Sequence, residues 1–195
     1  MIRIRLRYAT ARQAAAVVMF MALTAADARA QMSMGSFKGY LTGHVGTITG
    51  EPLTNERLTA GASVAVQELL GWGAEIDFGH TSDALVGRQL LDVNSYMVNA
   101  SWVRPHGRLR PFAVAGAGVM QIDGCDFPCN RAARTYDLGL SAGGGAFLAL
   151  HDMAGLRGDV RYFFAGADHP DLRRPENFHY WRISVGATFM WDILP

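Results

Sequence analysis

After residue 31, apolar side chains recur at every second position over most of the chain, and this period of two is the strongest constraint on the fold. The final segment displays it most fully: Trp181, Ile183, Val185, Ala187, Phe189 and Trp191 alternate with Tyr180, Arg182, Ser184, Gly186, Thr188 and Met190. Successive strand residues point to opposite faces, whereas helical geometry would scatter these apolar residues around an axis. The pattern predicts a strand with one apolar face and one polar or small face.

The same alternation recurs in seven earlier segments, which predicts eight strands in all. It is clear at 58–67, 72–79, 95–102, 136–143 and 156–164, and weaker at 39–48 and 111–122. The segment 111–122 is almost entirely small residues, so either set of side chains fits either face. The predicted connectors alternate between longer loops (49–57, 81–91, 123–134 and 166–177) and short turns (69–71, 105–108 and 151–155). Strands of about ten residues, with loops and turns at opposite ends, are typical of membrane β-barrels.

The first thirty residues have the pattern of a secretory signal peptide. Four arginines (Arg3, Arg5, Arg7 and Arg12) precede a 13-residue apolar run at 14–26, and Ala28-Arg29-Ala30 precedes Gln31. A buried N-terminal helix is the alternative. We therefore divide the chain into a signal peptide, 1–30, and a barrel domain, 31–195. Removal of five Arg and one Asp changes the formal net charge from +1 to −3, so nothing in the composition favours nucleic-acid binding.

Composition fits a barrel that closes within a membrane. The chain is 50% hydrophobic and only 18% charged, yet no segment after residue 30 has the ~20 apolar residues of a spanning helix. A bilayer offers no hydrogen-bond partners to the backbone, so a closed sheet is the remaining spanning structure. We predict an all-β, eight-stranded antiparallel up-and-down transmembrane β-barrel. The alternative is a soluble barrel or sandwich with its apolar face inward.

The polar face carries charged residues that a membrane barrel would enclose. Four acids and three arginines lie on it: Glu75, Asp77, Asp137, Asp159, Arg157, Arg161 and Arg182. The lumen of an eight-stranded barrel is just filled by side chains, and unpaired buried charge is very costly. We expect a mutually neutralising network, with a gated proton or ion path as the alternative. Aromatic residues near the ends of the apolar face resemble membrane-interface girdles: Trp72, Phe78, Tyr96, Trp102, Trp181 and Trp191.

Three stretches carry a resemblance to a known family. The segment 184–191 fits the polar-x-Gly-x-x-aromatic-x-aromatic pattern, with Gly186, Phe189 and Trp191 at the marked positions, that outer-membrane barrels present to the barrel-assembly machinery. The four residues after Trp191 depart from that pattern, since family members usually end on the last aromatic. Residues 110–118 and 155–163 are similar to the small outer-membrane β-barrel domain family, which includes OmpA-type, OmpX-type and opacity-type barrels. The resemblance implies the fold and an outer-membrane location in a Gram-negative-type bacterium.

Two cysteines lie in one predicted outer loop, in the sequence Cys125-Asp-Phe-Pro-Cys129. In an oxidising compartment such a pair indicates a disulfide. A zinc site would need four ligands, and the loop contains no His. We expect a disulfide that shapes the loop, and nothing in the sequence indicates a metal or a cofactor.

The one enzyme-like constellation is His80-Thr81-Ser82, with Asp92 further along the chain. It is similar to the His-x-Ser pair of PagL-type lipid A deacylases, in which His would act as base to a Ser nucleophile. The position in the chain and the identity of the acid both differ from that family. Solvated polar residues at a loop edge are the alternative, and we expect no catalysis.

The expected function is therefore structural or interactive. The expected partners are outer-membrane lipid or lipopolysaccharide, the barrel-assembly machinery, and an extracellular partner that binds through the loops, with a lipid A deacylase or a narrow channel as the alternatives. The sequence names no specific ligand.

Overall fold

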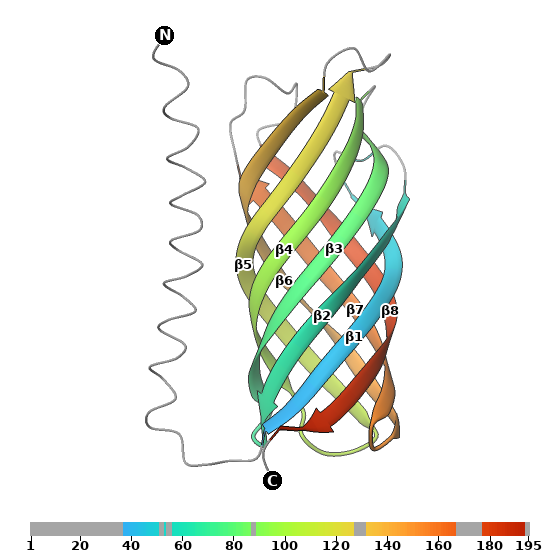
Figure 1. Ribbon diagram of the computed structural model, residues 1–195, viewed down its shortest axis with the longest axis vertical. Helices are drawn as coiled ribbons and strands as arrows, with labels where there is room; N and C mark the ends of the chain where they lie inside the picture. The colour runs from blue at the N-terminus through green and yellow to red at the C-terminus, as the bar shows by residue number, and fades with distance from the viewer. Residues whose placement is uncertain are drawn as a thin grey trace. The chain divides into compact units, whose positions relative to one another are not determined.

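Eight antiparallel strands form one closed barrel in the computed structural model, which describes residues 37–50, 53, 56–86, 89–126, 132–166 and 177–193. The strands are β1 (Phe37–Thr49), β2 (Arg57–Glu68), β3 (Trp72–Val86), β4 (Gln89–Val103), β5 (Leu109–Asp126), β6 (Ala132–His151), β7 (Ala154–Gly166) and β8 (Asn177–Asp192). Each strand pairs with its neighbour in sequence, and β8 pairs with β1 from Lys38↔Asp192 to Thr49↔Trp181. Figure 1 shows the strands tilted around a common axis, with β1 beside β8. The predicted fold class is confirmed.

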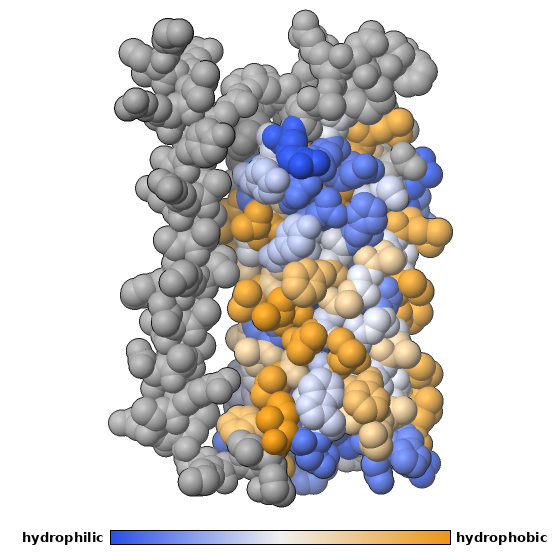
Figure 2. Space-filling view, in the orientation of Figure 1, coloured by the Kyte–Doolittle hydropathy of each residue, from blue (hydrophilic) through white to orange (hydrophobic). Residues whose placement is uncertain are grey.

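The predicted facing of the strands is also confirmed. On β8, Arg182 and Ser184 are buried while Ile183 and Val185 are exposed, and the other strands follow the same rule. On β5, where the sequence left the facing open, Phe112, Val114, Met120 and Ile122 point inward. The apolar face is the outer one, which excludes the soluble alternative with an inward apolar face. Figure 2 shows apolar residues across the middle of the visible face, between polar residues near its two ends.

Short turns join β2 to β3, β4 to β5 and β6 to β7 at one end of the barrel. In the first, the Gly71 amide donates to the Glu68 carbonyl at 2.8 Å, and Gly71 has a φ of 94°. Gly107 in the second turn has a φ of 97°. Both values lie in the left-handed region that glycine adopts without strain. We call this end the turn end and the opposite end the loop end.

The strands are longer than the sequence predicted, and two predicted loops were placed wrongly. The strands have 12 to 20 residues rather than about ten. β3 continues to Val86 and β4 begins at Gln89, so most of 81–91 is strand. β5 and β6 likewise extend into 123–134. These hairpins extend beyond the outer apolar belt, where apolar and polar side chains no longer alternate clearly along the strands. A register irregularity between Thr81 and Ala84 interrupts the pattern further.

Residues 1–36 lie outside the described part of the chain, so the signal peptide remains a prediction. Within the described residues, no helix is long and apolar enough to span a bilayer.

Candidate functional site

The lumen holds a buried layer of charged side chains contributed by β3, β7 and β8. Glu75 and Asp77 come from β3, Arg157, Asp159 and Arg161 from β7, and Arg182 from β8. Each is buried. They meet because β3 lies across the lumen from β7 and β8 in the closed barrel, although about 80 residues or more of chain separate them. The seventh predicted residue, Asp137, is buried on the inward face of β6.

Close ion pairs connect these six residues into one network. Arg157 Nη1 lies 2.6 Å from Glu75 Oε2, and Arg157 Nη2 lies 3.0 Å from Asp159 Oδ2. Arg161 Nη2 lies 2.7 Å from both Glu75 Oε1 and Asp159 Oδ2. The structure therefore brings these acids and arginines together, and each of the two arginines is shared between two carboxylates.

Asp77 joins the remaining arginine to the network. Arg182 Nη2 lies 2.9 Å from Asp77 Oδ2, and Arg161 Nη1 lies 3.7 Å from Asp77 Oδ1. The three arginine charges are thus matched by three carboxylates. Arginine suits this layer because its planar guanidinium carries several donors and remains charged when buried. Lysine, with a single point charge, could not bridge two carboxylates in the same way.

Aromatic rings support two of the arginines. The Arg157 guanidinium lies 4.4 Å from the centroid of the Phe112 ring and 5.0 Å from that of Phe147. The Arg182 guanidinium lies 4.9 Å from the centroid of Phe163. Contacts of this kind attract the cation to the ring face and gain strength where water is excluded. They hold the guanidinium groups in position for the ion pairs.

Two clusters of buried apolar side chains lie in the lumen, one on each side of the charged layer. Toward the turn end lie Tyr40, Ala65, Val103, Phe112, Val114, Phe147 and Met190. Toward the loop end lie Ile48, Ala84, Leu91, Val93, Met97, Met120, Ile122, Phe163, Ala165, Phe178 and Tyr180, with Leu53 packed against them. Both sets are buried, so the charged layer lies between two apolar layers.

The outer surface is apolar over the middle of the barrel, and its aromatic residues lie near the two ends of this belt. Trp72 and Trp102 are register partners near the turn end. Phe78 and Tyr96 pair edge to face with centroids 5.8 Å apart, and Tyr162 and Trp181 lie 5.1 Å apart. This distribution is that of a barrel whose outer face contacts lipid.

Comparison with known proteins agrees with this geometry. The model of the outer membrane protein beta-barrel domain family matches residues 14–189. The chain belongs to this family. The members of this family are outer membrane proteins, and this indicates an outer-membrane location. The predicted family is confirmed. No curated protein sequence gives a match.

Solved structures show the same fold at low sequence identity. Neisserial surface protein A is 11% identical with a TM-score of 0.63, and the match covers 78% of this chain and 96% of that one. The N-terminal β-barrel domain of Pseudomonas aeruginosa OprF is 12% identical with a TM-score of 0.57, over 81% and 100%. Ail, the attachment invasion locus protein of Yersinia pestis, is 15% identical with a TM-score of 0.53, also over 81% and 100%.

The lumen of this outer membrane barrel also contains polar contacts that sequence reasoning missed. Ser141 of β6 donates to Asn99 Oδ1 of β4 at 2.7 Å, across the intervening β5. The two side chains can meet because Gly116 of β5, which lies between them, has no side chain of its own. A Cβ on Gly116 would lie 2.5 Å from Asn99 Oδ1. Thr42 and Thr188 form a second buried pair at 2.9 Å. The available signal for the Ser141–Asn99 contact was the inward-facing Gly116, which lies between these two polar residues.

The enzyme-like residues lie on the outer surface of this barrel, near the loop end. His80 and Ser82 are exposed on β3, and Asp92 is exposed on β4. His80 Nδ1 lies 2.7 Å from Asn94 Oδ1, its register partner. In a catalytic triad this nitrogen is oriented by an acid; here its partner is an amide oxygen. Within the described residues, no group of three or more His, Cys, Asp or Glu side chains is arranged to hold a metal ion.

The residues of the assembly pattern occupy both faces of β8. Phe189 and Trp191 point outward and stack with centroids 5.9 Å apart. Trp191 also covers Gly39 of β1, where a Cβ would collide with the indole ring. Gly186 faces the lumen beside His44, and a Cβ on Gly186 would lie 3.0 Å from the Cβ of His44. The glycine of the pattern therefore leaves room for a neighbouring side chain of β1.

The predicted disulfide lies outside the described residues. The backbone of Cys125 belongs to β5, but its side chain and the whole of Cys129 fall in the part of the hairpin that is not described. The pairing remains a prediction.

Proposed function

We propose that this protein is a non-catalytic membrane anchor whose lumen is closed and whose loops make surface contacts. The observation that carries the proposal is the layered lumen: a neutral ion-pair network between two sets of buried apolar side chains. A conducting pore needs a continuous polar path, and the apolar layers on both sides of the arginines interrupt such a path. The narrow channel is therefore the less supported alternative.

The orientation of the barrel follows from its connections. Outer-membrane barrels place short turns in the periplasm and longer loops outside the cell. By this rule, the turns at Gly71 and Gly107 face the periplasm, and we expect the connections at the loop end to face outward. These outward connections are the surface available to lipopolysaccharide and to an extracellular partner. Gly186, Phe189 and Trp191 would act earlier, when the assembly machinery receives β8.

The absence of catalysis is part of the proposal. On the outer surface, the His80 imidazole contacts the side-chain amide of Asn94. This contact favours the interpretation that these polar residues lie beyond the apolar belt as surface residues, and not as a deacylase site. In a catalytic triad a carboxylate at this nitrogen stabilises the protonated base, whereas the Nδ1 atom of His80 contacts the Asn94 amide oxygen.

Two measurements test this function separately. Cell fractionation with a heat-modifiable gel shift should recover a folded barrel in the outer membrane; recovery in the soluble periplasmic fraction would refute the anchor. Purified protein in planar lipid bilayers should give no steady conductance above background. Steady channels that persist after repurification would refute the closed lumen and leave the location unaffected.

A further inference from the structure

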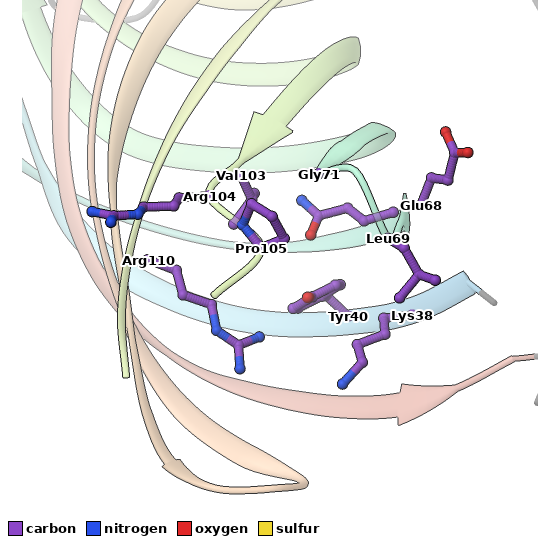
Figure 3. Close-up of a pocket in the computed structure, with 10 residues that line it drawn as sticks. Lys38, Tyr40, Glu68, Leu69, Gly71, Val103, Arg104, Pro105 and Arg110 are labelled. Atoms are coloured by element: carbon purple, nitrogen blue, oxygen red, sulfur yellow. The ribbon is translucent and has the colours of Figure 1, made fainter. Parts of the chain in front are cut away.

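A small cavity lies in the mouth of the lumen at the turn end of the barrel. Its volume is about 50 Å³, several times the space that a single water needs. Tyr40, Gln67 and Val103 in its lining are buried and belong to the inward faces of β1, β2 and β4. Figure 3 shows the lining, with Tyr40 near its centre. The side chain of Lys38, which also lines the cavity, is 44% exposed, so water reaches the cavity from the turn end.

The inner end of the cavity is closed by aromatic rings. Tyr40 packs against Phe147 with ring centroids 5.5 Å apart, and Phe147 packs against Phe112 with centroids 4.9 Å apart. The rings of Phe112 and Phe147 contact Arg157 of the charged layer on their other side. A solute that enters from the turn end would therefore stop at the mouth. This geometry is that of a binding site and not of a passage.

Backbone hydrogen bonds between two turns hold the walls of the cavity. The Val103 amide donates to the Gly71 carbonyl at 2.8 Å, which joins the end of β4 to the turn between β2 and β3. The Arg104 amide donates to the Pro111 carbonyl at 2.9 Å, which closes the connection between β4 and β5. The lining is therefore in place before a ligand arrives, and such preorganisation lowers the entropy cost of binding.

Two cations converge beside Tyr40 at the mouth. Figure 3 shows the Lys38 ammonium and the Arg110 guanidinium on the same side of the Tyr40 ring. The Arg110 guanidinium lies close enough to the Tyr40 hydroxyl to interact with it. Arg110 Nε donates to the Gly107 carbonyl at 2.9 Å, which orients the guanidinium and directs its terminal nitrogens to other partners. This side of the ring thus presents an ammonium, an oriented guanidinium and a phenolic hydroxyl.

The acids near the mouth neutralise these cations incompletely. Of the ten lining residues, Glu68 is the acid, and Figure 3 shows its carboxylate extending away from Tyr40. Asp192 lies 3.7 Å from the Lys38 ammonium but is 70% exposed, so water weakens this pair. The connection from β4 to β5 adds positive charge, because residues 104–110 contain three arginines and no acid. The mouth therefore attracts anions.

We propose that this cavity binds a phosphate group from the water at the turn end, either as inorganic phosphate or as the terminal group of a soluble phosphomonoester. A phosphate group has several acceptor oxygens and up to two negative charges. These match the guanidinium, the ammonium and the hydroxyl at the mouth, and the Gln67 side-chain amide adds a further donor to the lining. The site goes beyond the proposed anchor, and depends on it only for the expectation that the turn end faces the periplasm.

The test is an NMR titration of the folded, nitrogen-15-labelled barrel in a non-ionic detergent. Sodium phosphate replaces sodium chloride at constant ionic strength, so that general screening stays the same. The backbone amide signals of Gly71, Gly107 and Arg110 should shift and saturate, while amide signals from the loop end should not. Shifts that do not saturate, or equal shifts at both ends of the barrel, would overturn the proposal.

A second titration, with glycerol 3-phosphate, distinguishes the two sources of the phosphate group. Saturation of the same amides by the ester at similar concentrations supports a phosphomonoester as the ligand, with its organic part in the water. Saturation by inorganic phosphate alone supports the free ion. Saturation by neither compound would overturn the proposal.

Variants assign the binding to this cavity. Arg110→Gln and Lys38→Gln should each weaken phosphate binding about fivefold, as expected for the loss of one partly exposed ion pair. Arg104→Gln is the matched control, since it removes an arginine from the same connection whose side chain extends away from Tyr40 in Figure 3. Its loss should be much smaller. A loss equal to that of Arg110→Gln would indicate diffuse attraction to the turn and would overturn the site.

Folding and location are checked independently of phosphate binding. Each variant is first tested for the heat-modifiable gel shift. If Arg110→Gln does not fold, Arg110→Lys replaces it, and this variant should also bind phosphate more weakly because lysine lacks the planar set of donors. A folded wild-type barrel without saturable binding refutes this inference alone. Recovery of the protein in the soluble periplasmic fraction refutes the anchor.

Discussion

Arg161 and Arg182 are direct partners across β7 and β8, although each is only 1% exposed. Like charges opposite one another destabilise a strand pair, so this arrangement requires compensation from elsewhere. Asp77 supplies it from β3, on the other side of the lumen, by pairing with both arginines. The charged layer thus braces the barrel, because it links β3 to β7 and β8 on the other side of the lumen. Its charges also neutralise one another.

Replacement of Asp77 should therefore be severe. Asp77→Asn keeps the shape but removes the carboxylate that lies 2.9 Å from Arg182 and leaves the layer one negative charge short, and we expect the free energy of unfolding to fall by about 3–5 kcal/mol. The measurement is urea unfolding in phospholipid vesicles, followed by tryptophan fluorescence. Asp123→Asn, which removes a partly exposed ion pair, should cost no more than about 1 kcal/mol.

A double replacement distinguishes lost charge balance from lost packing. Asp77→Asn combined with Arg182→Met should regain part of the stability, because a neutral apolar side chain removes the excess positive charge. A double variant that is as unstable as the sum of the two single variants would contradict the bracing role of Asp77.

Two glycines should respond to alanine in opposite directions. A Cβ on Gly158, on the outer face, meets no atom within 4 Å, so Gly158→Ala should stabilise by about 0.5–1 kcal/mol through the reduced freedom of the unfolded chain. Gly116→Ala should destabilise, because its methyl group would enter the space of Asn99 and break the contact with Ser141. Unfolding curves of both variants under identical conditions provide the comparison, and equal shifts would be inconsistent with this packing.

The Asp123–Arg134 pair should give a pH dependence confined to acid. Burial alone would raise the pKa of the Asp123 carboxyl, but hydrogen bonds from Arg134 and Gln121 hold this pKa below its usual value. Asp123 lies beyond the outer apolar belt, past the Gln121–Tyr136 register pair. A lowered pKa in the folded state contributes stability above the unfolded-state pKa, and this contribution disappears as the pH falls through the lowered value.

The test compares Asp123→Asn with wild type at neutral pH and at about pH 3. The difference in the free energy of unfolding should shrink as the pH is lowered. A difference that is unchanged between the two conditions would show that the charge of Asp123 contributes nothing.

Catalysis at His80 and Ser82 has a direct cellular test. We expect cells that express Ser82→Ala or His80→Ala to have the same lipid A acylation as cells with the wild-type protein, and as cells without it. Mass spectrometry of extracted lipid A measures this. Loss of an acyl chain with the wild-type protein, abolished by either substitution, would establish a deacylase.

The predicted disulfide has a chemical test. Unfolded protein isolated from membranes should contain no reactive thiol before reduction and two afterwards, since Cys125 and Cys129 are the only cysteines. The ring is short, so the Cys125→Ser, Cys129→Ser double variant should lose only about 2 kcal/mol or less. Two thiols in the untreated protein would refute the pairing.

The sequence predicts this fold well because lipid and lumen impose different side chains on alternate positions. The prediction becomes ambiguous at 111–122, where small residues satisfy both faces, and fails at 81–91, where the strands continue beyond lipid. The charged residues of the lumen were visible as a set, but their partners were not. The pairing of Arg157 with Glu75 depends on the register and stagger of the closed barrel, which no local pattern encodes.

The contact between Trp191 and Gly39 has a consequence for the order of assembly. These residues belong to the last and first strands, and the neighbouring Thr42–Thr188 pair is separated by 146 positions along the chain. Joining such distant segments carries the largest loop-closure entropy in the barrel, and until the seam forms both strands retain unpaired edges. Trp191 reaches its position over Gly39 only when the ring closes. The fluorescence of Trp191 should therefore report the final step of folding. This step can be separated from the earlier insertion of the hairpins.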